Sequence, residues 1–195
     1  MCADTGAKTS SNDPISRSQY TAFRAYAPMK SAVEISIIDN LEGKTEPLSY
    51  SEAEKITALI RQNTQDVNQG EYTPDQIERL NAFATPEKIQ EEVKRGYLVT
   101  LSNDEGNLIG CGIVVRKGMK LIIKTMQVKT DYCRKGYGSI VYKHCENRFK
   151  QAGLHEIEVE VPKFPRSEAF YRKHGFIKTW NPTPMDLYLA MFKYL

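Results

Sequence analysis

Three apolar segments follow one another between residues 97 and 128, and short turn sequences separate them. The segments are "YLVTLS", "LIGCGIVVR" and "KLIIKTMQV", and the turns between them are "NDEGN" and "KGM". Short apolar runs bounded by glycine and asparagine are typical of strands, and connections of this length join neighbouring antiparallel strands. The sequence therefore predicts an antiparallel meander in the middle of the chain.

A basic, glycine-bearing turn, "RKGYGSIVYKH", comes straight after the third of these segments. Gly136 and Gly138 permit positive φ and close backbone approach, so that successive N–H groups can converge on an anion at a helix N-terminus. The apolar spacing of residues 138–152 predicts the helix that follows. A phosphate-binding turn is one interpretation, and a plain strand-to-helix turn is the alternative that this pattern leaves open.

The remaining segments predict an α/β chain. A strand ("AVEISIID") precedes a helix that we expect to begin at a capping box formed by Ser51 and Glu54. Residues 73–95 predict a helical region that is interrupted at "ATPEK", where a second Thr-Pro restarts the helix. The strand "HEIEVEV", the helix "RSEAFYRKHGF" and a closing hairpin complete the order β-α-α-β-β-β-α-β-α-β-β. This order contains about seven strands and four helices, and the meander predicts that much of the sheet is antiparallel.

Length and composition favour one main domain in a chain of 195 residues. Residues 1–30 are rich in Ser, Thr, Ala and Pro and predict a flexible tail, which leaves residues 31–195 as the folded domain. No apolar run approaches the roughly 20 residues that a membrane helix needs. The net charge of +3 is small, so binding to nucleic acid would require clustered charge.

The four cysteines, at positions 2, 111, 133 and 145, form no close CxxC pair. We therefore expect no metal site. No secretory segment precedes the domain, which favours reduced thiols and a cytoplasmic location.

Two motifs together resemble the GNAT superfamily of acyl-CoA-dependent N-acyltransferases, over roughly residues 33–195. "VKTDYCRKGYGS" is similar to the family's Arg/Gln-x-x-Gly-x-Gly/Ala element, with Cys133 in the Arg/Gln position. "SEAFYRKHGF" is similar to the family's element that ends in Tyr-x-x-x-Gly-Phe, through Tyr171, Gly175 and Phe176. The resemblance implies a GNAT-like α/β fold, with a mixed, largely antiparallel sheet of about seven strands flanked by four helices. It also implies that this sheet is splayed between the strands at 120–128 and 155–161.

The same resemblance implies that acetyl-CoA, as co-substrate, lies in the gap between those two strands. It assigns the pantetheine and oxyanion contacts to the backbone of Met126, Gln127 and Val128. It assigns the pyrophosphate to the glycine turn, namely Cys133, Arg134, Lys135, Gly136, Tyr137, Gly138 and Ser139. Residues 116–150 include ten Lys or Arg and two acidic residues. This excess of positive charge suits a phosphorylated ligand, and a solvated basic face is the alternative interpretation for many of the ten.

For catalysis, the resemblance points to Tyr171 as the acid that protonates the departing thiolate; aromatic packing is the alternative. Glu156, Glu158 and Glu160 alternate along one strand and so share one face, and Glu160 is our candidate base. Solvated or ion-paired glutamates are the default interpretation of that pattern. The three histidines receive no role. The resemblance makes Tyr72, Trp180 and Tyr188 candidates for an acceptor pocket, and core packing is the favoured alternative for most of them.

We therefore expect an acetyl-CoA-dependent N-acyltransferase that acetylates a primary amine by direct attack, with a small molecule favoured as acceptor. The alternatives are a protein Lys or N-terminal acetyltransferase and a non-catalytic acyl-CoA-binding regulatory module. A nucleic-acid-binding domain is the weakest interpretation, since no recognition motif accompanies the basic residues. We expect no nucleic-acid or membrane partner, and a homodimer is possible.

Overall fold

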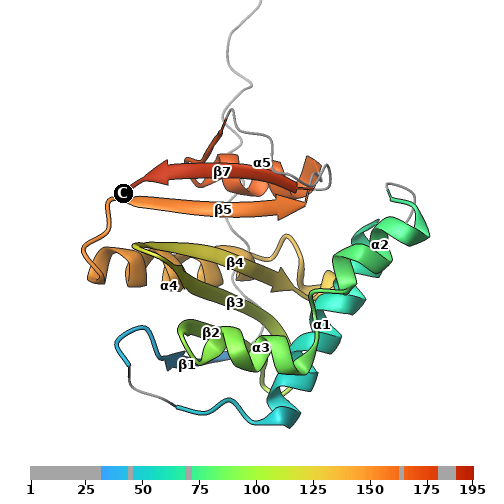
Figure 1. Ribbon diagram of the computed structural model, residues 1–195. Coiled ribbons are helices and arrows are strands. Elements are labelled where there is room, and N and C mark those ends of the chain that lie inside the picture. The colour runs from blue at the N-terminus through green and yellow to red at the C-terminus, as the bar shows by residue number, and fades with distance from the viewer. Residues whose placement is uncertain (1–31, 44–45, 69–71, 163–164, 180–187) are drawn as a thin grey trace, which may run out of the picture.

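The computed structural model describes residues 32–43, 46–68, 72–162, 165–179 and 188–195. The described strands form one seven-stranded sheet in the order β1-β2-β3-β4-β5-β7-β6 (Figure 1). The strands are β1 (Val33–Asp39), β2 (Gly96–Asn103), β3 (Leu108–Lys117), β4 (Lys120–Val128), β5 (Glu156–Pro162), β6 (Ile177–Lys178) and β7 (Tyr188–Tyr194). The helices are α1 (Tyr50–Asn68), α2 (Pro74–Asn81), α3 (Pro86–Val93), the short 3₁₀ helix η1 (Thr130–Tyr132), α4 (Tyr137–Gln151) and α5 (Pro165–Lys173).

Strands β1 to β4 form a continuous antiparallel meander, which confirms the prediction from the three apolar segments. A β-bulge interrupts the β3–β4 ladder, because Ile113 pairs with Thr125 while Val114 pairs with Ile123. Lys124 is thus the extra residue, and such a bulge bends the strand on which it lies. The second half of β4 consequently takes a different direction from the first.

The sheet is splayed between β4 and β5, as expected. These two strands are parallel, and within the described residues their ladder joins only Ile122 to Glu158 and Ile123 to Val159. β5 then pairs along its whole length with β7. Figure 1 shows the two strands running in the same direction and separating toward their C-terminal ends.

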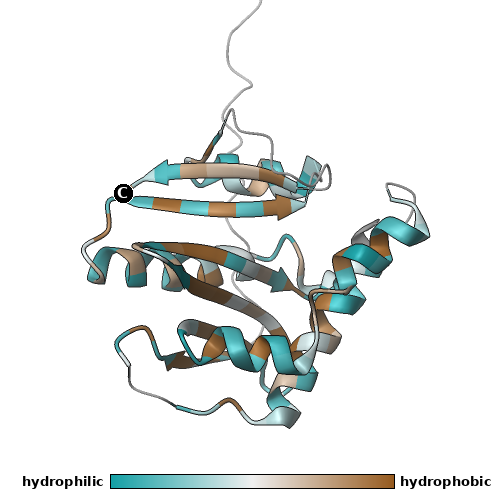
Figure 2. Ribbon diagram, viewed as in Figure 1, coloured by the Kyte–Doolittle hydropathy of each residue, from teal (hydrophilic) through white to brown (hydrophobic). Residues whose placement is uncertain are grey.

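Two hydrophobic cores lie on opposite faces of the sheet. One face of the sheet packs against α4 and α5, and its core includes Val141, Phe149 and Tyr171. The other face packs against α1 and α3 through Ile56 and Ile89. Figure 2 shows the hydrophobic colour concentrated on the strands and on the helix surfaces that turn toward them. Burial of apolar residues on both faces explains why β3 is apolar from Leu108 to Val115.

The helical region at residues 73–95 is two separate helices, so the described residues contain five α-helices where the sequence predicted four. Thr73 and Thr85 are the N-caps of α2 and α3, and each side chain accepts a backbone N–H from the first turn of its helix. Proline follows each threonine at the first helical position, where it needs no hydrogen-bond partner. The second Thr-Pro therefore starts a new helix instead of kinking an existing one.

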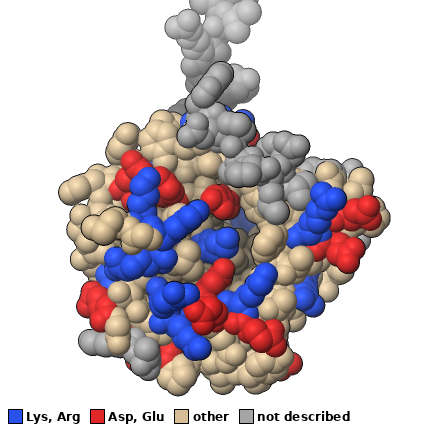
Figure 3. Space-filling model, viewed as in Figure 1, with Lys and Arg blue, Asp and Glu red and all other residues tan. Residues whose placement is uncertain are grey.

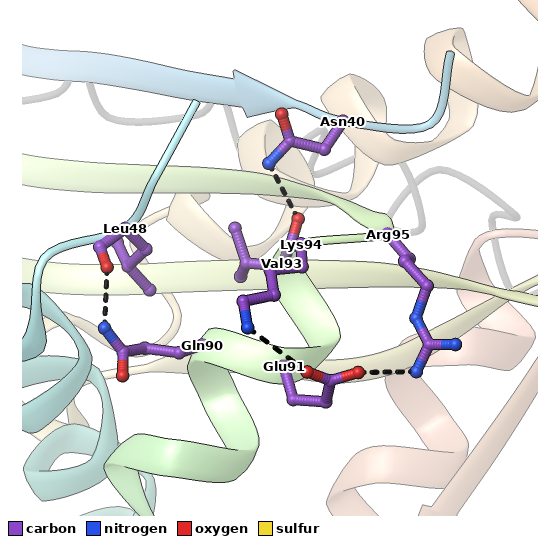
Figure 4. A network of polar contacts seen from close by, with 7 residues as sticks. All are labelled: Asn40, Leu48, Gln90, Glu91, Val93, Lys94 and Arg95. Carbon is purple, nitrogen blue, oxygen red and sulfur yellow. Dashed lines mark hydrogen bonds and ion pairs between the residues drawn. The ribbon is translucent and has the colours of Figure 1, made fainter. Parts of the chain in front are cut away.

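Polar contacts fix α3 to the chain that precedes α1 (Figure 4). The buried Asn40 side chain donates to the Val93 carbonyl at 2.9 Å, and Gln90 donates to the Leu48 carbonyl at 2.8 Å. These bonds satisfy backbone carbonyls that would otherwise be buried without a partner.

The capping box of α1 is formed by Ser49 and Glu52, and the prediction of Ser51 with Glu54 was wrong. The Glu52 N–H donates to Ser49 Oγ at 3.2 Å, and the Ser49 N–H donates to Glu52 Oε2 at 3.0 Å. The predicted tail at residues 1–30 lies outside the described residues. No described helix has the length and apolar character required to span a bilayer.

Candidate functional site

The second half of β4 presents an open backbone edge toward β5. The Lys129 N–H donates to the Ile109 carbonyl at 2.8 Å, which identifies a hydrogen-bonded pair in the β3–β4 ladder. Because such pairs alternate in an antiparallel ladder, the peptide groups of Met126 and Val128 point away from β3, into the splay. An extended ligand can pair with this edge as an added strand would.

Asn63 of α1 holds the end of this strand in place. Its side chain is buried and donates to Gln127 Oε1 at 3.2 Å and to the Val128 carbonyl at 2.8 Å. Both amide protons of Asn63 are therefore used, and its orientation is fixed by the two acceptors. This contact leaves the outward N–H groups of β4 as the donors available in the splay.

The glycine turn follows β4 after η1 and has the backbone conformation of an anion-binding nest. Arg134 and Gly136 both have left-handed conformation, with φ values of 62° and 95°. Left-handed residues that alternate with ordinary ones bring successive N–H groups together on a concave surface. Gly136 is also the N-cap of α4, and the N-terminus of a helix favours negative charge. The turn can thus bind an anion through its backbone.

Cys133 contributes to the shape of this turn. Its thiol lies 3.6 Å from the Val128 carbonyl and 3.7 Å from the Lys129 carbonyl. Although Cys133 is exposed, partial desolvation raises the pKa of its thiol, which remains a neutral donor at neutral pH. The residue in the family's Arg/Gln position therefore contacts the chain itself, while the exposed Arg134 and Lys135 supply the positive charge beside the turn.

Tyr171 lies in α5, within the core on the α4 side of the sheet. Its side chain is only 5% exposed, and it packs edge-to-face against Phe170 and Phe176. Burial raises the pKa of Tyr171, so its phenol stays protonated at neutral pH. Gly175, with a φ of 88°, ends the helix and lets the Phe176 N–H return to the Tyr171 carbonyl at 3.0 Å.

The three glutamates of β5 share one face, opposite the buried Ile157, Val159 and Val161. Glu156 and Glu158 form ion pairs with Lys120 of β4, at the end where the strands still pair. Among the described residues, Glu160 forms no ion pair. It lies next to Tyr188, whose pKa is raised by burial and, to a smaller extent, by the Glu160 charge.

Tyr188, the first residue of β7, pairs with β5 and contacts α2. Tyr188 and Tyr72 both pack against the buried Leu80 of α2. Two of the three predicted pocket aromatics thus lie together, near Glu160, and the third, Trp180, lies outside the described residues. A groove of about 750 Å³ lies beside this cluster, between α1 and α2, and includes Arg61, Ile77 and Glu78.

Charges of both signs are mixed on the face of the molecule that carries α1 and α3 (Figure 3). Lys120 with the β5 glutamates is one such group, and Glu91 with Lys94 and Arg95 is another. No group of His, Cys, Asp and Glu among the described residues is arranged to hold a metal ion.

Sequence reasoning missed three contacts around the site, which are made by Asn63, Lys120 and His174. Each makes its contact with a residue distant along the chain, since Asn63 bonds Val128, Lys120 pairs with Glu158, and His174 contacts Ser139. No local pattern marks such partners, because only the folded sheet brings them together.

The fold combines a splayed mixed sheet, a glycine turn with the conformation of a nest after β4, and a buried tyrosine in the helix after β5, and this combination matches the GNAT-like architecture that the sequence motifs imply. Residues 68–192 match the family described as "Acetyltransferase (GNAT) domain", and the chain belongs to this family. GNAT acetyltransferases use acetyl-CoA as co-substrate.

Solved structures show the same fold at low sequence identity. PaiA N-acetyltransferase from Thermoplasma acidophilum, in complex with coenzyme A, is 20% identical, with a TM-score of 0.68 over 84% of this chain and 99% of that chain. A GCN5-related N-acetyltransferase from Rhodopseudomonas palustris is 17% identical, with a TM-score of 0.65 over 85% and 96%. The ribosomal-protein-S18-alanine N-acetyltransferase from Escherichia coli is 15% identical, with a TM-score of 0.52 over 83% and 94%. No curated protein is significantly similar in sequence.

Proposed function

We propose that this protein transfers an acetyl group from acetyl-CoA to a primary amine, with a small molecule as the favoured acceptor. The observation that carries the proposal is the early end of the β4–β5 ladder. It stops after Ile123 and Val159, and so leaves an open strand edge directly before the nest at Arg134 and Gly136. A ligand with an amide arm joined to a pyrophosphate fits this combination of an added-strand edge and an anion site.

Different residues around the splay would bind different parts of the cofactor. The outward peptide groups of Met126 and Val128, on either side of Gln127, would pair with the pantetheine arm. The turn from Cys133 to Ser139 would hold the pyrophosphate through its backbone, with Arg134 and Lys135 adding charge. Gly138 lets α5 pack closely against the start of α4, because a Cβ there would lie 3.2 Å from the Phe170 ring. The helix start has no room for a larger side chain on the side that faces this ring.

Each chemical requirement of acyl transfer has a candidate in this chain. The co-substrate supplies the activated thioester; the amine nitrogen forms a bond to its carbonyl carbon as the carbon–sulfur bond breaks. An outward N–H of β4 stabilises the negative charge that develops on the carbonyl oxygen. Tyr171 donates its proton to the departing thiolate, and Glu160 accepts the amine proton through water.

The side of the sheet that carries Glu160 would bind the acceptor. Glu160 attracts a cationic amine, while Tyr188, Tyr72 and Leu80 offer an apolar surface for the rest of the molecule. An acceptor that combines an ammonium group with an apolar or aromatic body suits this lining.

The test is thiol release from acetyl-CoA by the purified protein, measured against a panel of primary amines, amino acids and peptides with a free N-terminus or lysine. Release that depends on a small amine supports the proposal. Release only with peptides would replace the small-molecule acceptor with a protein one. Tight acetyl-CoA binding without release across the panel would favour the regulatory module.

A further inference from the structure

His174 links the helix that carries Tyr171 to the anion-binding turn. It directly follows α5, and its Nε2 lies 3.1 Å from the Oγ of Ser139, in the first turn of α4. Its ring is held between two aromatic rings, with centroid distances of 4.4 Å to Tyr142 and 4.6 Å to Phe170. The imidazole therefore has a fixed position, and its one described polar contact is the Ser139 hydroxyl.

Which of the two groups donates the hydrogen bond decides whether the Ser139 hydroxyl can also donate to an anion. If the hydroxyl donates to His174, it has no proton left for an anion. If Nε2–H donates to Ser139 Oγ, the hydroxyl proton is free to point toward a phosphate oxygen. A bound pyrophosphate favours the second arrangement, because a donor aimed at an anion makes a strong, charge-assisted hydrogen bond.

We propose that His174 is a positioning residue for acyl-CoA binding, whose Nε2–H orients the Ser139 hydroxyl toward the cofactor's pyrophosphate. This inference rests on the proposed function, specifically on the glycine turn as the pyrophosphate site. It gives a role to a histidine that the sequence left unassigned.

α5 contacts the start of α4 at two points, one helical turn apart. Phe170 lies against Gly138, and His174 bonds Ser139. Tyr171 lies between these two residues in the chain. The helix that presents the proposed acid is thus fixed against the turn that holds the phosphates, so cofactor binding and the position of the acid depend on the same contacts.

The charges around His174 predict that coenzyme A affinity depends on pH. In the free protein its pKa is lowered, mainly by burial and then by Lys173 of α5, Lys193 of β7 and Lys143 of α4, while Glu146 of α4 opposes the shift. A bound pyrophosphate raises the pKa, because it favours the charged imidazolium. The complex then binds a proton more tightly than the free protein, and coenzyme A affinity rises as pH falls through the region below about 6.5.

A double-mutant cycle measured by coenzyme A binding tests the proposal. His174→Phe keeps the ring packing and removes Nε2, and we expect it to weaken binding about 3- to 10-fold, the value of one hydrogen bond. Ser139→Ala should weaken binding at least as much. The double variant should bind no worse than Ser139→Ala alone, because His174 acts through that hydroxyl. His155→Phe, at an exposed histidine, is the matched control and should bind as the wild type does.

Two further measurements separate orientation from structural damage. His174→Gln restores an N–H donor and should recover most of the affinity, while thermal denaturation shows that each variant is folded. Between pH 7.5 and 5.5 the wild type should gain more affinity than His174→Phe, and titration of the cofactor's own phosphate cancels in that comparison.

A His174→Phe effect that persists unchanged in the Ser139→Ala background would overturn the proposal, as would wild-type affinity in His174→Phe. Failure of the wild type to bind coenzyme A would remove the acyl-CoA assignment itself, and the inference with it.

Discussion

Burial of Tyr171 limits the chemical roles open to it. Burial raises its pKa, so the phenol is protonated in the neutral range and cannot act as a base, and the same burial makes it a weaker acid than an exposed tyrosine. We expect Tyr171→Phe to lower kcat by about 10- to 1000-fold, with little change in acetyl-CoA affinity. Steady-state kinetics together with calorimetric binding measure the two effects separately. A wild-type kcat in this variant would exclude Tyr171 from the mechanism.

Glu160 and Glu158 offer a matched pair for the role of the base. Both lie on the same face of β5, but only Glu158 is neutralised by Lys120. Glu160→Gln should reduce kcat/KM for a cationic amine by about 10- to 100-fold, because it removes both the attraction and the proton acceptor. Glu158→Gln should change it little. Equal effects from the two substitutions would assign the loss to the general charge of the strand and remove Glu160 as base.

At the scale of elements, the close approach of α4 to β3 depends on Gly112. A Cβ at this position would lie 2.6 Å from a methyl group of Val141 and 3.0 Å from the sulfur of Cys145. Gly112→Ala should therefore lower the free energy of unfolding by about 1–3 kcal/mol through overpacking. Chemical denaturation measures the loss.

Val141→Ala removes the methyl group that the new Cβ would meet. The double variant Gly112→Ala/Val141→Ala should be less destabilised than the sum of the two single variants. Strict additivity would show that the strain has another source.

The start of α1 is an element boundary that the sequence alone does not determine. The stretch "SYSEAE" contains two overlapping Ser-x-x-Glu patterns, and both satisfy the local chemistry of a capping box. The structure uses Ser49, while Ala53 and Ile56 are buried against the sheet. Tertiary packing is not encoded in the cap sequence, so the choice between the two serines was not predictable.

The glycine turn was predictable for the opposite reason. Gly136 has a φ of 95°, a conformation that only glycine adopts without strain, and so the backbone requirement is visible in the sequence. The contact between Ser139 and His174 spans 35 residues, and that between Lys120 and Glu158 spans 38. Such pairs depend on the order of strands in the sheet and leave no local signal.

At the scale of the whole molecule, buried weak acids make stability sensitive to high pH. Burial raises the pKa of Tyr97, Cys111 and Cys145 to about 12 each, from ordinary values of 10.0 for tyrosine and 9.0 for cysteine. The folded state therefore holds these protons more tightly than the unfolded chain. Their contribution to stability is complete below pH 9 and is lost as pH rises from 9 through 12.

We expect the free energy of unfolding to be lower at about pH 10.5 than at about pH 8, measured by denaturation under reducing conditions. Tyr97→Phe should show a smaller decrease, because its ring cannot ionise. An equal decrease in Tyr97→Phe would show that Tyr97 does not contribute.

The most direct test of the acyl-CoA assignment is calorimetric titration of acetyl-CoA into the wild type and into Gly138→Trp. We expect tight binding by the wild type and its loss in the variant. The Phe170 ring blocks the direction of the Gly138 Cβ, so the indole must displace that ring or project into the glycine turn, where the pyrophosphate is expected. Thermal denaturation should show that both proteins are folded. Unchanged affinity in a folded Gly138→Trp protein would contradict the assignment of the turn, and absence of binding by the wild type would contradict acyl-CoA as its ligand.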